Sequence, residues 1–121
     1  DRTFDGDGRV TVSFDVGGAK RDRVASLAIQ ANGKIVLVGS AQMDAAKDFD
    51  FAVVRLERNG GRDTTFNGDG KATIAFDRGG SKADFATGIA IDPNRRLVIA
   101  GGVATVTSGD FEFALTRLFG L

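Results

Sequence analysis

The sequence contains no cysteine and no histidine, and these absences remove whole classes of chemistry. Without cysteine there is no disulfide framework, no thiol nucleophile and no zinc–thiolate site. Without histidine the chain lacks the commonest general base and metal ligand at neutral pH. Tyrosine is absent too, which leaves Asp, Glu, Lys, Ser and Thr as the side chains that could act on a substrate. We therefore expect a protein that is not an enzyme.

Net charge and long apolar runs are also missing. Sixteen basic and sixteen acidic side chains cancel, so no net field draws the chain towards nucleic acid or anionic lipid. No apolar run approaches the roughly eighteen residues of a membrane-spanning helix, and the sequence does not open with a charged and then apolar leader. We expect a soluble protein with no nucleic-acid partner and no membrane insertion.

Proline is scarce and glycine abundant, with one proline and seventeen glycines in 121 residues. Val, Ile, Thr and Phe are prominent, and this composition is typical of short strands joined by tight turns. A hydrophobic share of 42% with 26% charged residues is ordinary for a globular domain. The composition predicts an all-β fold.

One stretch of the sequence occurs twice. Thr3 to Phe14, T-F-D-G-D-G-R-V-T-V-S-F, returns sixty-two residues later as T-F-N-G-D-G-K-A-T-I-A-F, and a gapless alignment of residues 1–59 with 63–121 matches 24 of 59 positions. This periodicity predicts two repeats, residues 1–62 and 63–121. Phenylalanines at matching positions are expected in the same kind of core. The pairs are Phe4/Phe66, Phe14/Phe76, Phe49/Phe111 and Phe51/Phe113.

Each repeat contains four strand-like segments, either alternating or continuously apolar. The turns A-N-G and P-N-R fit a type I turn followed by a left-handed residue, Gly33 or Arg95, and so predict an antiparallel hairpin. Four antiparallel strands repeating near sixty residues describe one blade of a β-propeller. The segments are Arg9–Phe14, Val24–Gln30, Lys34–Gly39 and Phe49–Leu56, then Lys71–Phe76, Ala86–Asp92, Arg96–Gly101 and Phe111–Leu118.

Three strings carry a family resemblance: D-T-T-F-N-G-D-G-K-A-T-I-A-F-D, A-T-G-I-A-I-D-P-N-R-R-L-V-I-A-G and F-E-F-A-L-T-R-L. They resemble the delta-60 repeat, a bacterial β-propeller repeat found in tandem arrays of large surface or secreted proteins. The resemblance covers essentially the whole chain in two copies, whereas known arrays are longer. It implies a propeller fold and a secreted or cell-surface origin, and it brings no catalytic activity with it.

Two glycine-rich turns hold candidate calcium ligands, because alternate oxygen-bearing side chains in such a turn can face one hard cation. An EF-hand loop needs further acidic ligands, and Thr11, Val12 and Ser13 follow instead. A tight turn into a strand, with Asp and Asn bonding their own backbone, is the competing interpretation. The candidates are Asp5, Asp7, Asn67 and Asp69.

Two more matched polar pairs need an explanation. Asp22 and Asp84 precede the inner strands, where repeated carboxylates could ring a channel mouth and bind a cation or polar ligand, or could bond neighbouring loop amides. Arg55 and Arg117 lie in otherwise apolar strands, and a buried arginine must be paired. We expect a structural contact with an aspartate of a neighbouring loop, such as Asp15 or Asp77.

The order of the strands predicts how copies of the chain assemble. If a blade runs from Val24–Gln30 outward to Lys71–Phe76, residues 9–14 are an outer strand without a blade, and residues 86–118 are three strands without an outer one. We expect the first strand of one chain to complete the last blade of another, head to tail, until a ring closes. A six-bladed homotrimer is the first expectation and an eight-bladed homotetramer the alternative.

These features together predict a non-enzymatic propeller scaffold or binding module, either natural or engineered, that presents loops for protein or carbohydrate contact. One alternative is a calcium-dependent carbohydrate-binding propeller. Another is a propeller hydrolase or lyase that uses carboxylates around the channel. No cofactor is expected unless the glycine-rich turns hold calcium.

Overall fold

The computed structural model describes residues 1–14, 21–44, 48–76, 83–105 and 109–120, and all regular structure in these ranges is β-strand. The strands form two antiparallel sheets, in the orders β1-β2-β3-β4 and β5-β6-β7, which we name the first and the second sheet. This confirms the all-β prediction and is consistent with part of a β-propeller. The strands are β1 (Asp22–Ile29), β2 (Ile35–Gln42), β3 (Phe49–Leu56), β4 (Lys71–Ile74), β5 (Asp84–Ile91), β6 (Leu97–Ala104) and β7 (Phe111–Leu118).

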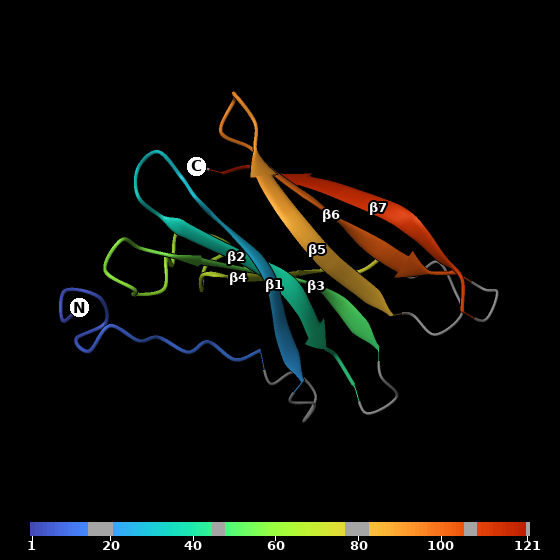
Figure 1. Cartoon of the computed structure of the whole chain (residues 1–121), viewed down its shortest axis with the longest axis horizontal. Helices are drawn as coiled ribbons and strands as arrows, with labels where there is room; N and C mark the ends of the chain where they lie inside the picture. Colours follow the sequence, from blue (N-terminus) through green and yellow to red (C-terminus); the bar gives the residue numbers. More distant parts are fainter. Residues whose placement is uncertain (15–20, 45–47, 77–82, 106–108, 121) are drawn as a thin grey trace.

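The two sheets lie against each other (Figure 1), and in the described residues an apolar core fills the space between them. From the first sheet Phe51 and Val53 point into it, and from the second Leu97 and Ile99 do so, all fully buried. Ring contacts extend the core, because Phe76 meets Phe51 edge-on with ring centroids 5.0 Å apart. In the described ranges no helix is long and apolar enough to cross a membrane.

Both tight hairpins have the geometry that their sequences predict. Gly33 and Arg95 have positive φ values of 84° and 63° at the turns that join β1 to β2 and β5 to β6. The Gly33 amide donates to the Gln30 carbonyl at 2.8 Å, and the Arg95 amide donates to the Asp92 carbonyl at 2.9 Å. Arginine in the left-handed region carries a steric cost that glycine avoids.

Each sheet has a β-bulge in its first strand, at Val24/Ser26 and at Ala86/Gly88. Beside each bulge a glycine lets the two backbones come close. A Cβ added at Gly39 would lie 1.8 Å from the Arg23 carbonyl oxygen, and one at Gly101 would lie 2.0 Å from the Phe85 oxygen. No other residue type fits these two positions without moving the backbone.

Two predicted features are not found in the single chain. Residues 9–14, predicted as an outer strand that completes a blade of another copy, belong to no strand here, and the edge of β3 is paired with β4. Phe111 and Phe113 are not core residues: Phe113 is fully exposed and Phe111 is 55% exposed, whereas the matching Phe49 and Phe51 are buried. The difference arises because the second sheet covers Phe51, while no described part of the chain covers the same face of β7.

Candidate functional site

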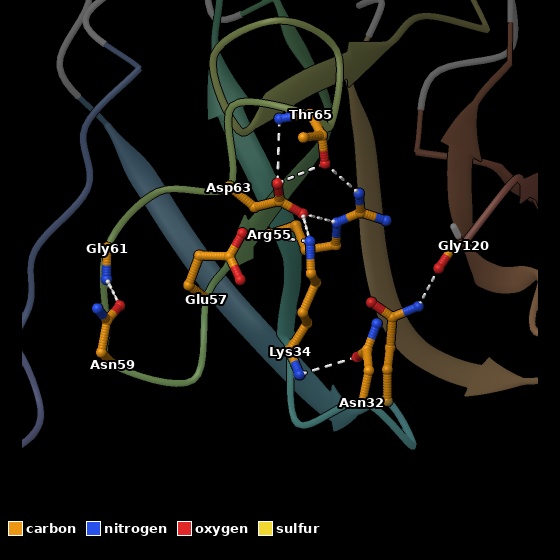
Figure 2. A network of polar contacts seen from close by, with 10 residues as sticks. Asn32, Lys34, Arg55, Glu57, Asn59, Gly61, Asp63, Thr65 and Gly120 are labelled. Atoms are coloured by element: carbon orange, nitrogen blue, oxygen red, sulfur yellow. Dashed lines mark hydrogen bonds and ion pairs between the residues drawn. The ribbon is translucent and has the colours of Figure 1, made fainter.

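Among the described residues the largest fully buried side chain is that of Arg55 on β3, and it bonds to the loop that leads into β4. Its Nε donates to Asp63 Oδ2 at 2.6 Å and its Nη2 donates to Thr65 Oγ1 at 3.3 Å (Figure 2). The guanidinium also lies 4.9 Å from the centre of the Phe66 ring. We call this pair of charges the Arg55–Asp63 clasp.

A second cation supports the clasp. Lys34 Nζ lies 2.7 Å from Asp63 Oδ2 and 3.2 Å from Glu57 Oε1. Burial alone would raise the pKa of the Asp63 carboxyl, but hydrogen bonds from Lys34, Thr65 and Arg55 outweigh it and hold that pKa well below its usual range. The same hydrogen bond to Asp63 is the main reason that the pKa of Lys34 is raised. Asp63 is therefore ionised at neutral pH.

Sequence reasoning found Arg55 but not its partner. Asp15 and Asp77, the partners suggested for it, lie outside the described residues, and the carboxylate that Arg55 binds is that of Asp63. A local signal was available, because Asp63 begins the string D-T-T-F and its Oδ1 accepts bonds from both N and Oγ1 of Thr65, at 3.0 and 2.5 Å. An aspartate that caps its own turn in this way can offer its second oxygen to an arginine.

The same turn exists a second time, sixty-two residues earlier. Asp1 Oδ1 accepts hydrogen bonds from Thr3 N at 2.9 Å and Thr3 Oγ1 at 2.6 Å. Gly8 N donates to the Phe4 carbonyl at 2.7 Å, as Gly70 N donates to that of Phe66 at 2.8 Å. The turn that starts at Asp1 is therefore folded in the same way as the one that starts at Asp63.

The arginine that would match Arg55 in the second sheet is Arg117 on β7, and it is exposed. Its side chain has no ion pair or hydrogen bond to any part of the chain that the structure describes. The reason is topological: β3 has β4 and the Asp63 turn beside it, whereas β7 is the last strand of its sheet. Asp1 and Arg117 thus stand at the positions that match Asp63 and Arg55, but in the part of the chain that the structure describes they form no such pair.

The candidate calcium ligands bond to their own turns. Asp7 Oδ1 accepts from Arg9 N and Asp69 Oδ1 accepts from Lys71 N, both at 2.9 Å. Asn67 Nδ2 donates to the Lys71 carbonyl at 2.7 Å, and both Asn67 and Asp5 have positive φ. In the described ranges no group of three acidic side chains could hold a metal ion. The geometry is that of tight turns.

The carboxylates suggested for a channel mouth bond to backbone amides. Asp22 Oδ2 accepts from Phe14 N at 2.9 Å, and Asp84 Oδ2 accepts from Phe76 N at 2.8 Å. Each aspartate thus fixes the segment that precedes its sheet. Phe14 and Phe76 are held at corresponding places on the first and the second sheet.

Two outer faces of the chain are apolar and exposed. On β1 they are the side chains of Val24, Leu27 and Ile29, and on β7 those of Phe111, Phe113 and Leu115. In Figure 1, β7 lies on the side of the second sheet away from the first, and residues 1–14 run alone along the opposite side of the molecule. Apolar groups in such numbers mark interaction surfaces.

Comparison with known proteins agrees with the fold. Residues 30–66 match the family model described as a domain of unknown function (DUF5122) beta-propeller. The matched range holds β2, β3 and both charges of the clasp. No curated protein matches the chain. The match supports a β-propeller repeat family.

Proposed function

We propose that the chain is a non-enzymatic β-propeller segment that assembles with further copies of itself, head to tail, into a closed ring. One observation carries the proposal. The contact between the two sheets has two sides, and the residues that match each side in the other repeat lie exposed on one of the two outer faces. On the first sheet the residues of this contact are Val36, Val38, Phe51 and Val53. Their counterparts sixty-two residues on are Val98, Ala100, Phe113 and Leu115, and the last two are among the most exposed apolar side chains of the protein.

The other half of the contact behaves in the same way. Ala86, Ile89 and Ile91 of β5 pack against the core between the sheets. Their counterparts on β1 are Val24, Leu27 and Ile29, which are exposed. Two copies can therefore repeat, between molecules, a contact that each already makes internally. Covering one such large side chain contributes about 1.5–3 kcal/mol, so several together favour association.

A contact between two different faces is heterologous, and it forms a ring where the rotation from copy to copy closes and an open filament where it does not. Propellers close with roughly four to eight blades, so two sheets per chain allow a few ring sizes. We propose the six-bladed homotrimer, with the eight-bladed homotetramer as the alternative. The resemblance to bacterial arrays makes a secreted or cell-surface scaffold, with loops available for protein or carbohydrate contact, the setting that we propose.

The absence of a catalytic role is part of the proposal. Cysteine, histidine and tyrosine are missing from the sequence. Asp7, Asp69, Asp22 and Asp84, the acidic side chains that could have served, each bond a backbone amide. No specific observation favours the calcium-dependent carbohydrate binder or the hydrolase.

Light scattering after size-exclusion chromatography tests the ring at micromolar concentration. We expect a particle of about three times the chain mass of 12.7 kDa. Phe113→Asp on one face and Leu27→Asp on the other should each give monomers, whereas Asn94→Asp, an exposed change in the turn between β5 and β6, should leave the ring intact.

Mixing the two face variants makes the test sharper. Each retains the face that the other has lost, so the mixture should form a dimer although each variant alone stays monomeric. A wild-type protein that remains at 12.7 kDa would refute the proposal.

A further inference from the structure

We propose that residues 1–14 and the outer face of the first sheet form a receptor for the β7 edge of a second copy. In this contact Arg117 of one copy binds Asp1 of the next, and Phe113 enters a cavity beside Gly39. The inference rests on the proposed ring and adds the contacts that fix how neighbouring copies meet.

If β7 pairs in the same register as β3, its free edge accepts a partner strand in one register only. In the first sheet β3 pairs with β4 through Phe51↔Ile74, Ala52↔Thr73, Val53↔Ala72 and Val54↔Lys71. Sixty-two residues away the same pairs are Phe113↔Val12, Ala114↔Thr11, Leu115↔Val10 and Thr116↔Arg9. Residues 9–12 belong to no strand of this chain. The Arg9 amide bonds the Asp7 side chain, as the Lys71 amide bonds Asp69 within the paired β4, and the other backbone groups of residues 9–12 are available to a partner.

Residues 1–14, which would pair with β7 of a second copy, are already folded against the first sheet. Their turn at Asp1 has the hydrogen bonds of the turn at Asp63, and the bond from Phe14 N to Asp22 matches the one from Phe76 N to Asp84. Residues 1–14 are therefore attached to the first sheet through the same bond that attaches residues 63–76 to the second. Docking needs little rearrangement, and this lowers its entropic cost.

The register that β3 has with β4, applied to β7 and the first segment of a second copy, brings together the opposite charges of Arg117 and Asp1. Within the first sheet Arg55 N donates to the Gly70 carbonyl and Asp63 N donates to the Arg55 carbonyl, at 2.9 and 3.0 Å, which brings the two side chains together. Arg117 has on β7 the position that Arg55 has on β3, and Asp1 has in its turn the position of Asp63. Both side chains are exposed. Each supplies the opposite charge that the other lacks.

An apolar cavity receives the aromatic side chain of the same edge. The Phe51 ring presses on Gly101, where an added Cβ would lie 2.8 Å from Phe51 Cζ. The counterpart of Gly101 is Gly39, and beside it is a cavity of about 290 Å³ whose lining includes Val24, Leu37, Ala52, Val12 and Phe14. These residues match the surroundings of Phe51, so the fully exposed Phe113 of a second copy fits there as Phe51 fits on Gly101.

Association constants of matched variants test these contacts. Arg117→Gln is compared with Arg21→Gln, and Phe113→Ala with Phe119→Ala; all four residues are exposed in the single chain, so each variant should keep the wild-type circular dichroism spectrum. Arg117→Gln and Phe113→Ala should each weaken association by about thirtyfold or more, because the first leaves a carboxylate unpaired and the second empties a buried site. The two controls should change it by less than about threefold.

Disulfide trapping reads the register directly, and the native chain has no cysteine to interfere. Thr116→Cys with Arg9→Cys places one thiol on each strand at a directly opposed pair, which antiparallel strands hold within disulfide range. Oxidation should give covalent oligomers, while Thr116→Cys with Thr11→Cys, two residues out of register, should stay mostly monomeric on denaturing gels.

The outcomes separate the two proposals. A monomeric wild-type protein would refute the ring and this docking together. A ring that tolerates Arg117→Gln and Phe113→Ala as well as the controls, or that cross-links out of register as readily as in register, would overturn the docking and leave the ring standing.

Discussion

Arg55→Ala should destabilise the protein far more than the same substitution at Arg117. The change removes the 2.6 Å bond to Asp63 and leaves that carboxylate, which is fully buried, with one cation fewer. Breaking a buried pair by removing one partner costs roughly 3–5 kcal/mol. Lys34 still reaches Asp63 at 2.7 Å, so the loss should fall at the low end, about 3 kcal/mol.

Urea unfolding at pH 7 measures this loss, with both substitutions made in the Phe113→Asp background so that assembly does not add to the apparent stability. Arg117→Ala should then change the free energy of unfolding by less than about 0.5 kcal/mol, because its side chain is exposed. The two positions share the same strand sequence context, so the control differs chiefly in burial. Equal losses at the two positions would show that the Arg55–Asp63 clasp does not stabilise the fold.

Three further predictions follow from the same structure. Because the folded-state pKa of Asp63 is depressed, its contribution is present above the unfolded value near 3.8 and is lost as pH falls towards the folded value; acid titration should therefore destabilise the wild type more than Asp63→Asn. Gly39→Ala should cost about 3 kcal/mol in urea unfolding because its Cβ meets the Arg23 backbone, whereas Gly88→Ala, with open space around it, should be nearly neutral. Millimolar calcium should leave the melting temperature unchanged, since Asp7 and Asp69 already bond to their turns; a rise would support the calcium site.

The bounds of some strands and the conformation of the turns could be predicted from the sequence, because residues close together in the chain determine them. The string F-D-F-A-V-V-R-L and its repeat F-E-F-A-L-T-R-L predicted the bounds of β3 and β7 as the structure has them. The turn letters likewise predicted positive φ at Gly33 and at Arg95. In each case the deciding interactions lie within a few residues of chain.

What depends on distant neighbours could not be predicted in this way. Phe51 and Phe113 lie in nearly the same sequence, F-D-F-A and F-E-F-A, yet one is buried and the other fully exposed. The partner of Arg55 was also missed, because several aspartates lie in the loops on either side of β3 and only the course of the loop selects Asp63. Burial and pairing are properties of a side chain's surroundings, which identical strings do not share.

The buried charges of Arg55 and Asp63 select the register of β4 on β3, which apolar side chains alone leave open. A strand edge recognised through apolar side chains and backbone hydrogen bonds alone can slip by two residues and still present the same face. Such a slip of β4 along β3 would carry Asp63 about 6–7 Å from Arg55, given a rise near 3.3 Å per residue, and would leave two charges buried without partners. That penalty exceeds the loss of one apolar pair, so the clasp selects the register Phe51↔Ile74 over its neighbours. The same reasoning applies to the proposed contact between copies, where Arg117 and Asp1 stand at the positions of Arg55 and Asp63 and would select the register in the same way.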